Sequence, residues 1–199
     1  MPVITSRCSR HSAVLSRAVS SVSLAVALLR GVNVGGHSRL PMAELRSTLS
    51  NQGFDGVQTY LQSGNVVLDP GRRLLQELPT ALETAIADQF GLEVRVIVRA
   101  RDDLAAVAAA HPFRDDDSDH SRLHVVFLES APAAGKVADL DPDRSPPDRF
   151  EVKGREIYLC YPHGQGRSKL GLDYFERVLG VAGTARNWNT ITKLVEMVS

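Results

Sequence analysis

The chain has 199 residues, of which 43% are hydrophobic and 23% charged, and its formal net charge is zero. This length is sufficient for one domain or two small ones with a substantial core. Zero net charge argues against a protein whose whole surface binds nucleic acid or a membrane. Two cysteines, Cys8 and Cys160, are too few for a disulfide framework. No apolar run reaches the roughly 18 residues that span a bilayer, and we expect a cytoplasmic protein without membrane partners.

Residues 1–22 are rich in serine and arginine and contain no acidic residue. This composition is found in organellar targeting segments and in disordered tails. A start position assigned upstream of the natural one would produce a similar extension. The segment lacks the apolar stretch of a secretory signal peptide. We therefore treat residues 1–22 separately from the folded part.

Residues 23–100 alternate between apolar runs and helical patterns. Strands are predicted at 24–29, 57–61, 66–68 and 94–98. Helical spacing of apolar residues predicts one helix from Pro41 to Gly53 and another from Pro79 to Gly91. The order β-α-β-β-α-β is that of the ferredoxin-like fold. The sequence thus predicts an α/β (α+β) protein whose first subdomain has this topology.

Residues 101–199 repeat part of this pattern. We predict a helix at 102–110, a strand at 123–128, a weak helix at 131–139, a hairpin at 149–161, and helices ending near 179 and 198. This second α/β subdomain is a partial echo of the first, with extra C-terminal helices. Three aspartates at 115, 117 and 119 resemble the start of a calcium loop, but the required glycine and glutamate are missing. We expect no metal site.

A glycine-rich loop follows the first strand and contains one arginine and one asparagine, Arg30 and Asn33. In the predicted topology, the end of the first strand lies beside the connection between the second and third strands. That connection carries Gln62, Ser63 and Asn65. Ligands often bind at such sheet edges. The competing interpretation is that these polar side chains satisfy backbone groups of their own loops.

Two further polar clusters lie near the C-terminus. The first places Arg167 and Lys169 at a helix start, although it matches neither a P-loop nor a dinucleotide-binding motif. The second contains Arg186, Asn187 and Asn189 around Trp188. Trp188 is either an interface anchor or part of the core. The side chains of both clusters are cations and hydrogen-bond donors, which suit the recognition of anions.

The motifs ALLRGVNVGGHSRLPMAEL, VQTYLQSGNVV and GRSKL…YFERVLGVAGTARNWNTITKLVEM closely resemble those of the DUF1697 family, a domain of unknown function. The resemblance covers about residues 24–198. It implies two ferredoxin-like-related α/β subdomains and no established activity. The residues that match the family's motif positions are Arg30, Asn33, Gln62, Ser63, Asn65, Arg167, Lys169, Arg186, Asn187, Trp188 and Asn189.

Our leading hypothesis is a protein that binds a phosphate-bearing or otherwise anionic ligand, a nucleotide or nucleic acid, in a polar cleft between the two halves. Its ligand-binding residues would be the polar members of this motif set, without Trp188. One alternative is an enzyme acting on a small phosphorylated or carboxylated substrate through His37 or Ser63, although no catalytic constellation is recognisable. Another is a protein-interaction module anchored by an exposed Trp188. The central strands lack the aromatic residues with which an RNA-recognition module stacks bases. The sequence assigns neither a cofactor nor an oligomeric state.

Overall fold

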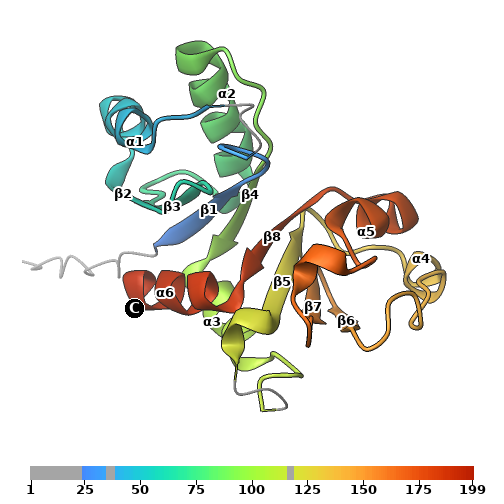
Figure 1. Cartoon of the computed structure of the whole chain (residues 1–199). Coiled ribbons are helices and arrows are strands. Elements are labelled where there is room, and N and C mark those ends of the chain that lie inside the picture. The colour runs from blue at the N-terminus through green and yellow to red at the C-terminus, as the bar shows by residue number, and fades with distance from the viewer. Residues whose placement is uncertain (1–23, 35–38, 116–118) are drawn as a thin grey trace, which may run out of the picture.

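The computed structural model describes residues 24–34, 39–115 and 119–199. It is a mixed α/β structure built around two four-stranded antiparallel sheets (Figure 1). The elements of the first half are β1 (Ala25–Leu29), α1 (Met42–Asn51), β2 (Asp55–Tyr60), β3 (Asn65–Asp69), η1 (Leu75–Glu77), α2 (Leu78–Phe90) and β4 (Val96–Ala100). Its strand order is β2-β3-β1-β4, which confirms the predicted ferredoxin-like topology.

Helix α3 (Arg101–Ala109) leads from β4 into the second half. The elements that follow are η2 (His120–Arg122), β5 (Leu123–Leu128), α4 (Ala134–Ala138), β6 (Arg149–Lys153), β7 (Glu156–Cys160), η3 (Gln165–Arg167), α5 (Leu172–Leu179), β8 (Gly183–Asn187) and α6 (Trp188–Val198). The second sheet has the order β6-β7-β5-β8. It repeats the order of the first sheet, because β8 completes a second β-α-β-β-α-β unit. The predicted echo is therefore fuller than the sequence pattern suggested.

The strand β8 was not predicted. Its sequence, Gly-Thr-Ala-Arg-Asn, contains no large apolar residue and was interpreted as a cluster of donors before the last helix. It nevertheless pairs with β5 from His124↔Asn187 to Leu128↔Gly183. The polar strand is stable here because the side chains of Thr184 and Arg186 are buried and hydrogen-bonded.

Three apolar clusters hold the fold together. Helices α1 and α2 cover one face of the first sheet, and α5 packs on the outer face of the second. Between the sheets lies a shared cluster that joins their remaining faces to α3 and α6 (Figure 1). Strand β1 is buried on both faces, with every residue at most 1% exposed. Its uninterrupted apolar sequence follows from this position.

The helix ends follow the expected local chemistry. Pro41 precedes α1, and Glu44 lies in its first turn, where a negative charge interacts favourably with the helix dipole. Helices α2 and α5 end at Gly91 and Gly180, which adopt the left-handed conformation with φ of 65° and 71°. Within the described residues, no helix has the length and apolar character needed to cross a membrane.

Candidate functional site

The edge predicted from the strand topology exists. Asn33 adopts a left-handed conformation, with φ of 55°. Its side-chain amide donates to the carbonyl oxygens of Leu40 (2.9 Å) and Gln62 (2.8 Å), and its Oδ1 accepts from the Leu40 N–H. The glycine-rich loop and the β2–β3 connection are therefore neighbours, as predicted. The hydrogen bonds of Asn33 serve to join these two loops.

Arg186 connects the two halves through a fully satisfied guanidinium group. Its Nε donates to Asn65 Oδ1, and Nη1 donates to Thr184 Oγ1 and the Ala185 carbonyl. Nη2 donates to the carbonyl oxygens of the first half that belong to Leu29, Ser63 and Gly64. All five N–H groups thus have acceptors within the protein.

The environment of Arg186 contains no compensating charge. Arg186 is 7% exposed, and it forms no ion pair with any other described residue. Burial lowers the pKa of Arg186 to about 10, so the side chain is still charged at neutral pH. Asn65, which is fully buried, also donates to the Tyr60 carbonyl and to Ser63 Oγ. Arg186 and Asn65 therefore form a buried polar connection between the sheets.

Arg30 is paired with an acid of the second half. Its Nη2 lies 2.7 Å from Glu176 Oε2, and the other Glu176 oxygen accepts from the Gly183 N–H at 2.7 Å. The Arg30 side chain is 38% exposed. Among the predicted cations, Arg30 and Arg186 come together at the junction of the two halves.

The remaining predicted residues lie in other surroundings. Arg167 and Lys169 are exposed, and the backbone of Lys169 is bonded to the connection between α4 and β6 through Arg144 and Ser145. Asn187 caps α6 by accepting from the Thr190 N–H, and Asn189 is exposed. The four predicted cations do not meet in one cleft.

A cleft follows the free edge of β4. It has a volume of about 860 Å³. Its floor is formed by residues 95–100, and the segment 70–83 of the first half contributes one wall. Asp103 of α3 together with Glu129 and Arg155 of the second half forms the other wall. We call this cleft the β4 groove.

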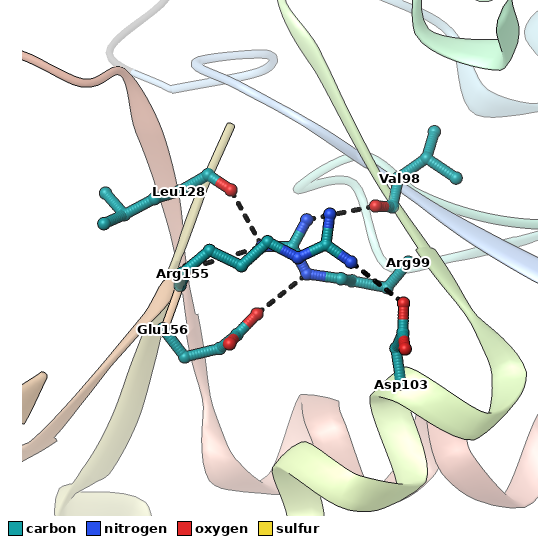
Figure 2. Close-up of polar contacts among 6 residues, drawn as sticks. All are labelled: Val98, Arg99, Asp103, Leu128, Arg155 and Glu156. Atoms are coloured by element: carbon teal, nitrogen blue, oxygen red, sulfur yellow. Dashed lines mark hydrogen bonds and ion pairs between the residues drawn. The ribbon is translucent and has the colours of Figure 1, made fainter. Parts of the chain in front are cut away.

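The floor of the β4 groove contains a buried arginine, Arg99, which is 1% exposed (Figure 2). Its Nε donates to Glu156 Oε1 at 2.9 Å, and Nη2 donates to the Leu128 carbonyl at 2.8 Å. Burial is the main cause that lowers the pKa of Arg99, and the nearby positive charge of Arg155 lowers it further. The groove thus places two guanidinium groups close to one another.

Two ion pairs flank the groove. Arg155 Nη2 lies 2.9 Å from Asp103 Oδ2, and Arg95 Nε lies 3.2 Å from Glu129 Oε1 (Figure 2 shows the first pair). Their arginine side chains are 41% and 57% exposed. A guanidinium group has five N–H donors, and each pair occupies only part of them. Both guanidinium groups therefore have N–H donors beyond those in their ion pairs.

The structure does not support Ser63 as a catalytic residue. Ser63 Oγ accepts from Asn65 rather than facing a base, and no group of three or more metal-ligating side chains occurs in the ranges that the structure covers. His37, the other predicted catalytic residue, lies outside the described residues, and so does Asp117 of the aspartate-rich loop. Trp188 is 3% exposed within the shared core and so does not form the exposed anchor of an interaction module.

Among the described residues, His111 is a buried histidine without a complete set of hydrogen bonds. Its Nδ1 accepts from the Phe113 N–H at 3.3 Å, which places the proton of the neutral ring on Nε2. Within the described ranges, Nε2 has no hydrogen-bond partner. The ring packs edge-to-face on Tyr158 and Trp188, with centroid distances of 5.2 and 4.8 Å. This burial lowers its pKa to about 4.

The β4 groove is not predictable from a local sequence pattern. Arg95, Glu129 and Arg155 lie in three separate connections, and no local motif links them. One signal was available, since the β-α-β-β-α-β topology places its fourth strand at an edge of the sheet. Which charged side chains lie beside that edge depends on how the two halves pack, and the sequence does not show this.

The fold is that of a two-sheet α/β protein, and the β4 groove is lined by residues of both ferredoxin-like halves. The chain belongs to the DUF1697 family of proteins of unknown function, whose model matches residues 23–158. A solved structure of the conserved bacterial protein SP0830 from Streptococcus pneumoniae has the same fold, with a TM-score of 0.68 and 24% sequence identity. The match covers 89% of this chain and 99% of that one. No curated protein matches the sequence.

Proposed function

We propose that the protein binds an anionic ligand in the β4 groove. The observation that carries this proposal is a cleft lined by two exposed guanidinium groups, those of Arg95 and Arg155. An anion in the groove would accept hydrogen bonds from the donors that their ion pairs leave unused. The volume of about 860 Å³ falls in the range of roughly 300–1,000 Å³ that is usual for ligand sites.

The groove replaces the predicted cations as the proposed site. Arg186 uses every donor within the protein, and Arg30, which is paired with Glu176, does not line the groove. Arg95 and Arg155 are exposed enough to contact a ligand and retain unused donors. Their acidic partners, Glu129 and Asp103, keep the groove from attracting anions in general. The ligand must therefore place its negative groups at the two arginines.

A thermal-shift panel of phosphate, citrate, ATP and acidic peptides tests this proposal. A ligand present at about 100 times its Kd stabilises the protein by about 2.7 kcal/mol, which raises Tm by several degrees for a chain of this size. We expect Arg95→Gln with Arg155→Gln to abolish the shift of any compound that binds. The changes should cost the fold little, because exposed ion pairs contribute about 0–1 kcal/mol.

The matched control changes two exposed cations outside the groove, as Arg167→Gln with Lys169→Gln. It removes the same charge from the surface and should leave the shift unchanged. The proposal is wrong if no compound of the panel raises Tm. It is also wrong if the control pair, rather than the groove pair, removes the shift.

A further inference from the structure

Strand β4 lies at the edge of the first sheet and has one strand neighbour, β1. The hydrogen bonds from Arg30 N to Arg95 O (2.9 Å) and from Arg101 N to Leu24 O (3.0 Å) delimit this pairing. The ladder between them joins Leu28 to Ile97 and Val26 to Arg99. Backbone groups alternate in direction along a strand. The backbone N–H and C=O groups of residues 96, 98 and 100 therefore point away from β1 and into the β4 groove.

Side chains of the protein occupy part of this edge. Glu83 Oε1 accepts from the Val96 N–H at 2.8 Å, and Arg99 Nη1 donates to the Val98 carbonyl at 3.0 Å. An unpaired strand edge is a template for another chain, and proteins commonly cover such edges. These two contacts occupy the positions that a neighbouring strand would take. The outer edge of β4 is therefore covered by side chains and not by another strand or a helix.

The walls of the groove suit a single extended chain. Leu74 and Leu75 line it although they are 56% and 41% exposed, which makes them two of the most exposed large apolar residues described. The five residues of β4 extend over about 17 Å at the usual rise of a strand. Because β4 forms the floor between two walls, the sheet edge of a second copy would meet those walls first. A single extended segment needs only the free edge of β4 and occupies less space between the walls than a second sheet would.

We infer that the anionic ligand of the β4 groove is an extended acidic peptide segment of a partner protein, which adds to β4 as a fifth strand. This inference rests on the proposed function. The peptide backbone would pair with residues 96, 98 and 100, where it replaces Glu83 and Arg99. Its acidic side chains would contact Arg95 and Arg155, and an apolar side chain would cover Leu74 and Leu75. Backbone pairing supplies the affinity, and the side chains supply the selectivity.

The experiment titrates the full chain with a blocked peptide of alternating valine and glutamate, about seven residues long to match the strand. Binding is followed by amide NMR shifts and by hydrogen exchange. We expect the amides of Val98 and Ala100 to become protected. A peptide of the same sequence, N-methylated at every residue, keeps the charge but has no N–H with which to pair on either edge. It should bind at least about tenfold more weakly, as expected from the loss of one or more hydrogen bonds.

A pair of variants tests the same point from the side of the protein. Val98→Pro removes the outward N–H, and proline is tolerated on a strand edge whose N–H faces away from the sheet. Val98→Ala trims the same side chain but keeps the N–H. Only the proline variant should lose binding. The N-methylated peptide tests the inference without a variant, whether or not the proline variant folds.

The outcomes separate this inference from the proposed function. If ATP, citrate or phosphate binds in the groove and the peptide does not, the proposed function stands and strand addition is wrong. Equal binding of the N-methylated peptide also refutes strand addition. A concentration-dependent dimer that Val98→Pro abolishes would assign the edge to a second copy instead. If nothing binds, both proposals fail.

Discussion

Arg186→Met tests the role of the buried arginine that connects the two halves. The variant keeps an unbranched side chain of similar reach but removes all five donors. Asn65 Oδ1 and the carbonyls of Leu29 and Ser63 then lose the bonds that Arg186 supplies across the junction. The Gly64 carbonyl retains its bond from the Leu29 N–H at 2.8 Å.

The magnitude follows from the number of acceptors left without a partner. Each unsatisfied buried polar group costs about 1–3 kcal/mol. Three such groups would give about 3–9 kcal/mol, and the variant recovers part of this because the charged guanidinium is no longer buried. We expect the free energy of unfolding to fall by about 3–5 kcal/mol. Urea denaturation at neutral pH measures this change.

Arg30→Met provides the matched control at the same junction. It removes a cation that is 38% exposed from its pair with Glu176, and its loss should cost less than that of Arg186 because water can replace part of its interactions. Both variants replace an arginine by methionine, at a buried position in Arg186→Met and at a partly exposed one in Arg30→Met. If Arg186→Met costs no more than Arg30→Met, Arg186 does not hold the halves together and our assignment of its donors is wrong.

Two further predictions concern stability. Burial lowers the pKa of His111 to about 4 in the folded protein, so only the unfolded chain binds this proton between that pH and about 6.5. The contribution of neutral His111 to the free energy of unfolding is fully present above pH 6.5. It decreases as the pH falls, by up to about 3 kcal/mol near pH 4. Urea unfolding across this range should show a weaker pH dependence for His111→Phe, and equal profiles would refute the assignment. Gly64 has φ of 76°, and an added Cβ would lie 2.5 Å from Val32 Cγ2. We therefore expect Gly64→Ala to cost about 2–4 kcal/mol and Gly71→Ala, with φ of 61° and open space around it, about 1–2 kcal/mol; equal losses would contradict this reasoning.

Much of the fold could be predicted because its signals are local. The buried strand β1 is apolar throughout, and α1 and α2 show apolar residues at helical spacing between recognisable start and stop residues. The order of these elements was enough to derive the strand arrangement of the first sheet. The same topology correctly brought Asn33 next to Gln62.

The missed features depend on tertiary structure. Strand β8 is polar, and Arg186 within it is stabilised by carbonyls of the first half that a local pattern does not reveal. The charge of Arg186 suggested an anionic ligand, whereas its acceptors turn out to be uncharged groups of the protein. The β4 groove similarly depends on how Arg95 meets Glu129 across the two halves.

The central claim is that the anion-binding site is the β4 groove rather than the exposed cations near α5. Amide NMR shifts on titration with the valine–glutamate peptide test it most directly. We predict that the shifted residues cluster on Val96–Ala100 and around Arg155, and that Arg95→Gln with Arg155→Gln removes the effect. Shifts that cluster on Arg167–Lys169 and leave β4 unchanged would contradict the claim.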